Sequence, residues 1–224
     1  MPARIAHICV YPVKGLSAQP IPVTELSPGA CLPNDRRFAI AHGASHFDPA
    51  APAWHPKRQF LMLMQNERLA ALETWFDAET GLLTIRRDGK QVARGNIETQ
   101  IGRDLVNQFF AAYMGREALG APKLVEAPGV NFTDSRQKYV SLINLASVAD
   151  LERVIRKPVD WRRFRGNLMI EGLEPWAEFD LVGREVTIGP ARLRIEERIG
   201  RCAATNVDPE TAQRDMNVPK SLLT

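Results

Sequence analysis

Cys202 is one of three cysteines in the sequence, and its surroundings suit a reactive thiol. It follows Gly200-Arg201 at the end of a strand-like run and precedes a turn at Asp208-Pro209. A glycine that ends a strand leaves the next residues in a loop, where functional groups gather. The adjacent guanidinium favours the thiolate form, which attacks electrophiles and binds soft metals. The alternative is that Cys202 packs as a small hydrophobic residue, as many free cysteines do.

Several cationic side chains share a place in a turn or at the end of a predicted strand. They are Lys14, Arg36, Arg162, Arg163, Arg165 and Arg201. Guanidinium groups suit phosphate and other planar anions, and a lysine adds a point charge. Taken one at a time, such residues are mostly solvated surface. An anion site is therefore predicted only if the fold brings these residues together.

A histidine-rich loop is a weaker candidate for a metal site. His42 and His46 stand four residues apart, with Asp48 and His55 nearby. Two imidazoles at this spacing suit zinc when they share a helical face. Glycine and several prolines interrupt the segment, so no helical face is expected and no metal site is predicted there.

Length and composition fit a soluble globular protein of one large or two small domains. The chain has 224 residues, of which 45% are hydrophobic and 25% charged, with a formal net charge of +3. This charge is too small to indicate a nucleic-acid surface. No signal peptide or membrane span is expected. Three widely separated cysteines do not suggest a disulfide framework, which favours a reducing, cytoplasmic setting.

Hydrophobic periodicity predicts many short strands and few helices, which indicates a β-rich α+β protein. Strands are expected over 4–10, 22–26, 37–41, 82–86, 91–95, 167–170, 185–188 and 192–197. A hairpin turn is expected at Asp88-Gly89. Amphipathic helices are expected over 67–76, 104–114 and 147–156, with Gly115 as a C-cap of the second. The best candidate domain boundary lies in the glycine- and proline-rich stretch 115–128, which divides the chain into residues 1–118 and 119–224.

Two groups of motifs resemble known domains. The second half resembles the MOSC domain, named after the C-terminal part of molybdenum cofactor sulfurases, in Arg165-Gly166-Asn167, Pro175-Trp176-Ala177-Glu178, Gly200-Arg201-Cys202 and Val207-Asp208-Pro209. The start resembles the β-barrel domain that precedes it in the amidoxime-reducing component and its bacterial relatives, in Tyr11-Pro12-Val13-Lys14-Gly15 and Asp35-Arg36-Arg37-Phe38. The resemblance implies a small β-barrel-like domain over 1–118, followed by a MOSC β-barrel domain with a few flanking helices over 119–224.

The resemblance also implies a cofactor site. In cofactor-binding members, the cysteine that matches Cys202 ligates molybdenum beside the dithiolene of a phosphorylated pterin. The positions that match cofactor contacts are Lys14, Gly15, Arg36, Lys138, Arg165, Asn167, Gly200 and Arg201. Gly15 and Gly200 stand where reductase relatives often have serine, and the residue types at Gln137 and Lys138, which align with a further contact region, also differ. Family domains usually continue beyond the position of Leu223, so the resemblance implies a shortened C-terminal end.

Three functions follow as hypotheses. The first is a molybdenum-dependent reductase of small N-hydroxylated compounds that receives electrons from a separate protein. The second is a sulfur carrier or cofactor-handling protein with a persulfide on Cys202. Pyridoxal-phosphate binding is associated with the family as a whole, but no lysine-bound pyridoxal-phosphate desulfurase domain is recognisable in this sequence. A separate donor would therefore supply the sulfur. The third is a β-rich domain in which Cys202 is buried and the arginines are solvated.

Overall fold

A four-stranded sheet joins segments from both ends of the chain. The computed structural model describes residues 3–223, and its largest sheet has the strand order β2-β1-β9-β8. These strands are β2 (Gln19–Ile21), β1 (Arg4–Val10), β9 (Leu168–Glu171) and β8 (Leu142–Asn144). Neighbours are antiparallel except β8 and β9, which are parallel. The sheet therefore brings the segment after β1, which carries Lys14, beside the segment that leads into β9.

Two helices belong to the same half of the molecule as this sheet. They are α2 (Leu145–Ile155) and α3 (Val218–Ser221). Val148 and Leu151 of α2 share a buried hydrophobic cluster with Met169 of β9. The spacing of three residues places both side chains on one face of the helix, as its amphipathic pattern predicts.

The other half of the molecule is built around an antiparallel meander. Strands β4 (Glu73–Asp77), β5 (Leu82–Arg87) and β6 (Lys90–Asn96) pair in sequence order. The predicted hairpin at Asp88-Gly89 is confirmed, and both turn residues have positive φ angles of 52° and 73°. That conformation is typical of the two-residue turns that match the twist of paired strands.

Helix α1 (Gln100–Met114) packs on this meander. It begins one turn earlier than predicted, because the Thr99 side chain caps it by accepting a hydrogen bond from the Gly102 amide. A Cβ at Gly102 would lie 1.9 Å from the Asn96 carbonyl oxygen, so only glycine allows this close approach. Gly115 follows with φ 54° and is the predicted C-cap.

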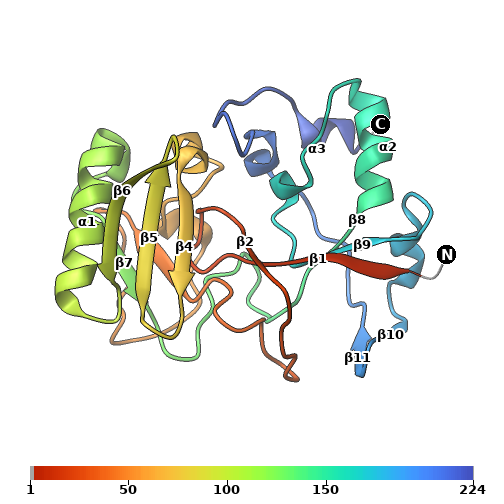
Figure 1. Cartoon of the computed structure of the whole chain (residues 1–224), viewed down its shortest axis with the longest axis horizontal. Coiled ribbons are helices and arrows are strands. Elements are labelled where there is room, and N and C mark those ends of the chain that lie inside the picture. Colours follow the sequence, from red (N-terminus) through yellow and green to blue (C-terminus); the bar gives the residue numbers. More distant parts are fainter. Residues whose placement is uncertain (1–2, 224) are drawn as a thin grey trace.

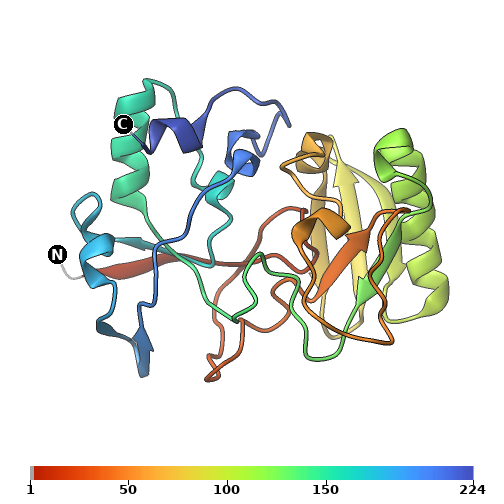
Figure 2. The same cartoon turned by 180° about the vertical axis from the view of Figure 1, so that it is seen from behind.

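The two halves form lobes that lie side by side (Figures 1 and 2). The meander, α1 and the pair β3 (Phe38–Ala41) and β7 (Lys123–Glu126) form the first lobe, and the four-stranded sheet with α2 and α3 forms the second. Strands β1 and β2 thus come from the N-terminal part of the sequence but pair within the second lobe. The chain crosses between the lobes more than once, and these crossings place distant residues at the boundary.

One predicted helix and one predicted strand are wrong. The helix over 67–76 is a short 3-10 turn, Glu67–Ala71, followed by β4. In β4, Thr74 and Phe76 are buried while their neighbours are more exposed, and this period of two outweighs the local helical spacing. The strand expected over 22–26 has no ladder partner in the described part of the chain; β2 lies a few residues earlier.

The β-rich α+β class is confirmed, but the sheets do not close into barrels. Within residues 3–223 the sheets have four, three, two and two strands, and each keeps open edges. The hairpin of β10 (Glu185–Ile188) and β11 (Ala191–Arg194) pairs only with itself. Ile195 still exchanges backbone hydrogen bonds with Gly183 and Arg184, but within the described chain residues 196–200 have no strand partner, so the predicted strand over 192–197 ends early.

None of the helices in residues 3–223 combines the length and apolar character needed to cross a membrane.

Candidate functional site

One cavity between the lobes collects nearly all the predicted site residues. It has a volume of about 250 Å³, and both lobes contribute to its lining. The predicted residues that line it are Lys14, Gly15, Arg36, Arg163, Arg165, Asn167, Gly200, Arg201 and Cys202. Lys138 does not line this cavity. Residues up to 188 positions apart in the chain therefore meet at one place, which sequence spacing alone does not reveal.

Lys14 is held in the cavity wall by the turn after β1. Its backbone amide donates to the Phe38 carbonyl at 2.8 Å, and Gly15 follows with φ 84°. A Cβ at Gly15 would also lie 3.0 Å from the Leu61 carbonyl oxygen, so a serine here would be strained. The Lys14 ammonium is buried and donates to the Phe132 carbonyl at 2.9 Å. Burial lowers the pKa of Lys14, and the nearby carboxylate of Asp134 opposes this shift.

Arg36 has a dedicated counter-ion. Its guanidinium lies 2.5 Å from the buried carboxylate of Asp35 and donates to the Arg165 carbonyl at 2.9 Å. It also lies over the ring of Tyr11, 4.6 Å from the centroid. These contacts fix Arg36 in one orientation and balance its charge without any ligand.

Arg165 is different, because its guanidinium has no carboxylate partner and no hydrogen-bond acceptor among residues 3–223. It follows the 3-10 turn Trp161–Phe164 in the left-handed conformation, with φ 53°. The guanidinium lies over the Tyr11 ring, 4.3 Å from the centroid. Burial lowers the pKa of Arg165 to about 10. Partial burial of a cation that lacks a partner within residues 3–223 is unfavourable, so this position favours an anionic ligand.

Arg201 and Cys202 enter the cavity from the extended segment after β11. The Arg201 guanidinium donates to the Phe164 carbonyl at 3.2 Å, and burial lowers the pKa of this residue. The Cys202 side chain is half-buried rather than enclosed in hydrocarbon. Its carbonyl accepts hydrogen bonds from the Thr205 hydroxyl and amide at 2.9 and 3.1 Å, which fix the backbone below the sulfur. The Cys202 sulfur therefore faces a cationic cavity.

The other two cysteines have a different environment. Cys9 and Cys31 are buried, and burial raises the pKa of each thiol to about 11. Both therefore stay protonated near neutral pH and pack as small apolar groups. The contrast between these two buried thiols and the half-buried Cys202 agrees with the choice of Cys202 as the candidate reactive thiol.

Two residues of the cavity were not found by sequence reasoning. Lys57 comes from the 3-10 turn Lys57–Gln59, and its ammonium lies 3.5 Å from the Cys202 sulfur. Asp134 bridges two cations, with one carboxylate oxygen 2.5 Å from Lys14 and the other 2.9 Å from Lys57. Burial alone would raise the pKa of Asp134, but the two lysines outweigh it and hold the pKa at about 2. Neither residue lies in a motif, so no local pattern marked them.

Asn167 lines the cavity but already uses its side chain within the fold. Its amide oxygen accepts from the Ser141 amide and hydroxyl at 3.1 and 2.9 Å, and its amide nitrogen donates to the Cys9 carbonyl at 3.1 Å. Asn167 thus ties β1 to the segment before β8. Gly200, in contrast, has open space around the position of a Cβ, so the absence of a serine hydroxyl there leaves room in the cavity.

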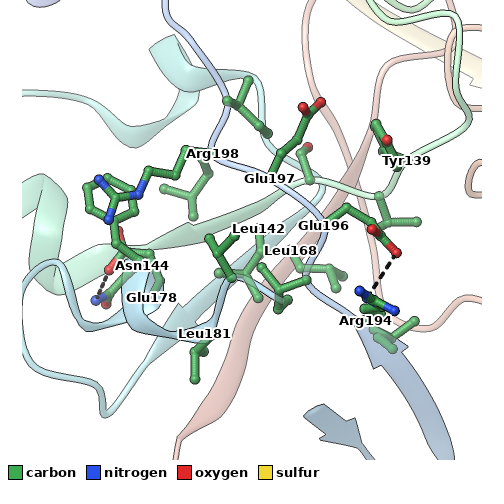
Figure 3. A pocket seen from close by; sticks show the side chains of 18 of the residues that line it. Tyr139, Leu142, Asn144, Leu168, Glu178, Leu181, Arg194, Glu196, Glu197 and Arg198 are labelled. Atoms are coloured by element: carbon green, nitrogen blue, oxygen red, sulfur yellow. Dashed lines mark hydrogen bonds and ion pairs between the residues drawn. The ribbon is translucent and has the colours of Figure 1, made fainter. Parts of the chain in front are cut away.

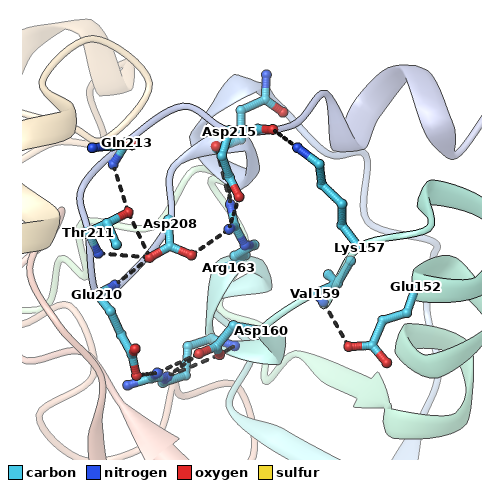
Figure 4. A network of polar contacts seen from close by, with 12 residues as sticks. Glu152, Lys157, Val159, Asp160, Arg163, Asp208, Glu210, Thr211, Gln213 and Asp215 are labelled. Carbon is cyan, nitrogen blue, oxygen red and sulfur yellow. Dashed lines mark hydrogen bonds and ion pairs between the residues drawn. The ribbon is translucent and has the colours of Figure 1, made fainter.

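The salt-bridge network in Figure 4 holds the loop after Cys202 in place. Arg163 is buried, with 1% of its side chain exposed, and it pairs with Asp208 at 2.6 Å and with Asp215 at 2.9 Å. The Asp208 carboxylate also accepts from the amides of Glu210 and Thr211. These contacts fasten residues 206–215 to the turn that presents Arg165.

A larger cavity of about 640 Å³ lies beside β8 and the β10–β11 hairpin (Figure 3). Its walls are mainly apolar and include Leu142, Leu168 and Leu181, and Lys138 lies here. Cys202, Lys14 and Arg165 are not among its lining residues. The smaller cavity is therefore the better candidate site despite its smaller volume, because the thiol and the cations meet there.

Comparisons with known proteins find a family match in the second half of the chain. Residues 127–222 match the MOSC domain family. A molybdenum cofactor sulfurase of Anopheles gambiae is 29% identical over 94% of this chain, which covers 31% of that protein. A molybdenum cofactor sulfurase of Danio rerio is 35% identical over 36% of the chain and 11% of its own length. The chain thus spans about a third or less of the curated relatives it matches. The likeness of residues 1–118 to the N-terminal barrel domain stays a prediction.

Proposed function

We propose that the protein binds the molybdenum cofactor in the cavity around Cys202, on the premise that residues 127–222 match the MOSC domain family. The observation that carries the proposal is the half-buried guanidinium of Arg165, which has no ion-pair or hydrogen-bond partner within residues 3–223 and lies in the same cavity as a half-buried thiol. An anionic ligand with a soft metal would satisfy both groups at once.

The residues present fit such a ligand. A cysteine thiolate is a soft donor suited to a thiophilic metal, so Cys202 would be the metal ligand. Lys14 and Arg165 would bind the phosphate and the polar edges of the pterin, and Arg201 would orient the part nearest the sulfur. The cavity also shares Gly15 and Arg165 with a wider cleft of about 760 Å³, which offers space beyond the 250 Å³ chamber.

The reaction that we propose is the reduction of a small N-hydroxylated compound. One amidoxime or hydroxylamine, two electrons and two protons give the corresponding amidine or amine and one water. The bound cofactor would supply the two-electron redox chemistry. The chain would bind and orient it, and the Lys57 ammonium would keep a proton beside the Cys202 sulfur. A separate electron-transfer protein would deliver the electrons.

A sulfur carrier is the second candidate, because the relatives are named molybdenum cofactor sulfurases and Cys202 is only half-buried. A persulfide donor would transfer its outer sulfur to the Cys202 thiolate, which forms a Cys202 persulfide and releases the donor as a thiol.

Turnover separates the two candidates. Protein from a host that makes the cofactor is assayed for oxidation of reduced methyl viologen by benzamidoxime, with Cys202→Ser as the matched variant. The reductase proposal predicts turnover that falls at least about 100-fold in Cys202→Ser, because the metal ligand is lost. Wild-type protein without turnover, whose Cys202 peptide gains one sulfur atom by mass spectrometry after treatment with a persulfide donor, would contradict the reductase and support the carrier.

A further inference from the structure

Asp134 places a negative charge inside the cavity, at a position where an anionic ligand would be expected to bind. Its two carboxylate oxygens form ion pairs with the two ammonium groups of the cavity, with Lys14 at 2.5 Å and with Lys57 at 2.9 Å. Arg36 already has Asp35, whereas Arg165 has no counter-ion in residues 3–223. A ligand that reaches these lysines must therefore compete with a carboxylate of the protein itself.

The segment that carries Asp134 is held by polar and ring contacts rather than by apolar packing. Besides the two lysines on Asp134, the Trp54 indole donates to the Thr133 carbonyl at 3.3 Å, and the Arg136 guanidinium lies 5.0 Å from the centroid of the Trp54 ring. We call residues 133–140 the strap. Before it, Phe132 is buried, and its amide donates to the Arg36 carbonyl at 2.8 Å. After it, Ser141 is hydrogen-bonded to Asn167. The strap itself has no helix or strand, and none of its side chains belongs to a buried hydrophobic cluster of the described chain. Segments with so few packed contacts open at low cost.

The strap also forms part of the cavity wall. Thr133, Asp134, Ser135, Gln137 and Tyr139 line the chamber that contains Cys202. The Asp134 side chain is 55% exposed, so it can rotate or move into solvent without leaving a buried carboxylate unpaired. Lys14 is buried and cannot follow it. Movement of Asp134 would thus leave a fixed cation ready for another anion.

We propose that Asp134 is an internal counter-ion that keeps the ligand-free site occupied, and that the anionic group of a phosphate monoester displaces it from Lys14 and Lys57. This inference rests on the proposed function, since it assumes that an anion binds among these cations. A carboxylate that holds the site in about 90–99% of molecules lowers the apparent affinity for an anion by about 10- to 100-fold. Asp134 would therefore keep weakly binding anions out of the site, and its charge would offset the repulsion between the two lysines.

The test measures binding of inorganic phosphate to ligand-free protein by isothermal titration calorimetry. Asp134→Asn is expected to bind phosphate at least about tenfold more tightly than wild type, because the competing charge is gone. Asp104→Asn, at an exposed position of α1, changes the net charge equally and should leave the affinity unchanged. Adding Lys57→Met to Asp134→Asn should remove much of the gain.

Hydrogen exchange gives an independent readout of the displacement. In wild type, saturating phosphate should speed amide exchange in the strap, because Asp134 releases its hold on the two lysines. Exchange that stays the same or slows would contradict displacement. An equal or weaker phosphate affinity of Asp134→Asn, with measurable binding in wild type, overturns this inference and leaves the cofactor proposal standing. If Asp134→Asn binds phosphate more tightly but the wild-type protein never contains molybdenum, the inference is supported and the cofactor proposal is rejected. If neither wild type nor Asp134→Asn binds phosphate, the inference and the cofactor proposal are both rejected.

Discussion

Replacing Arg163 with methionine is expected to lower the free energy of unfolding by about 3 kcal/mol. The side chain is almost fully buried and pairs with both Asp208 and Asp215. Methionine fills much of the volume but leaves two carboxylates close together without their cation. Breaking a buried ion pair from one side costs about 3–5 kcal/mol, and the partial exposure of both aspartates places this case at the lower end. Urea denaturation measures the change.

The adjacent arginine is the matched control. Arg162 also forms ion pairs, with Asp160 and Glu210, but 38% of its side chain is exposed. Solvent screens such pairs, so Arg162→Met should cost no more than about 1 kcal/mol. Equal losses in the two variants would show that the network around Arg163 does not hold the loop after Cys202. Adding Asp208→Asn and Asp215→Asn to Arg163→Met should recover part of the loss, because the unpaired charges are then removed.

Replacing Arg165 with glutamine should weaken anion binding strongly without harming the fold. Within residues 3–223 the guanidinium has no counter-ion, so its removal relieves a partial desolvation cost and gives up the contact with the Tyr11 ring. We expect the free energy of unfolding to stay equal or rise by up to about 1 kcal/mol. Phosphate affinity should fall about 10- to 100-fold, because hydrogen bonds to charged groups contribute about 1.5–3 kcal/mol each.

In Arg165→Gln the stability is expected to stay equal or rise while the phosphate affinity falls, and these opposite directions make the prediction specific. Calorimetric titration with phosphate and urea denaturation of the same samples measure both. A structural role for Arg165 predicts a loss of stability with unchanged phosphate affinity, which would contradict our interpretation. Arg94→Gln is a suitable control, because Arg94 on β6 is exposed, lies outside the Cys202 cavity and the wider cleft, and should change neither quantity by much.

The sequence allowed the local elements and most of the site to be predicted. The hairpin at Asp88-Gly89 and the helix that ends at Gly115 follow from turn and cap chemistry, which is local. The family motifs pointed to Cys202, Lys14 and Arg165, and these residues do meet in one cavity. The spacing of apolar residues over 67–76 was ambiguous, and pairing of β4 with β5 decided it in favour of a strand.

The features that were missed depend on tertiary placement. Lys57 lies in a loop without a motif, and only the fold brings its ammonium to the Cys202 sulfur. Asp134 was not recognisable as a counter-ion, since both of its partners come from distant segments. The sequence also did not show that the Asn167 side chain is hydrogen-bonded within the fold, or that Lys138 lines the cavity beside β8. Such contacts depend on the crossings between the two lobes.

The most direct test of the central claim is the ratio of molybdenum to protein after purification from a host that makes the cofactor. Elemental analysis of wild type and Cys202→Ser, combined with pterin fluorescence after acid oxidation, gives the result for both parts of the ligand. We predict about one molybdenum and one pterin per chain in wild type, and less than about a tenth of that molybdenum in Cys202→Ser. Wild-type protein that contains neither, or a serine variant that keeps all its molybdenum, would contradict the assignment of Cys202 as the metal ligand.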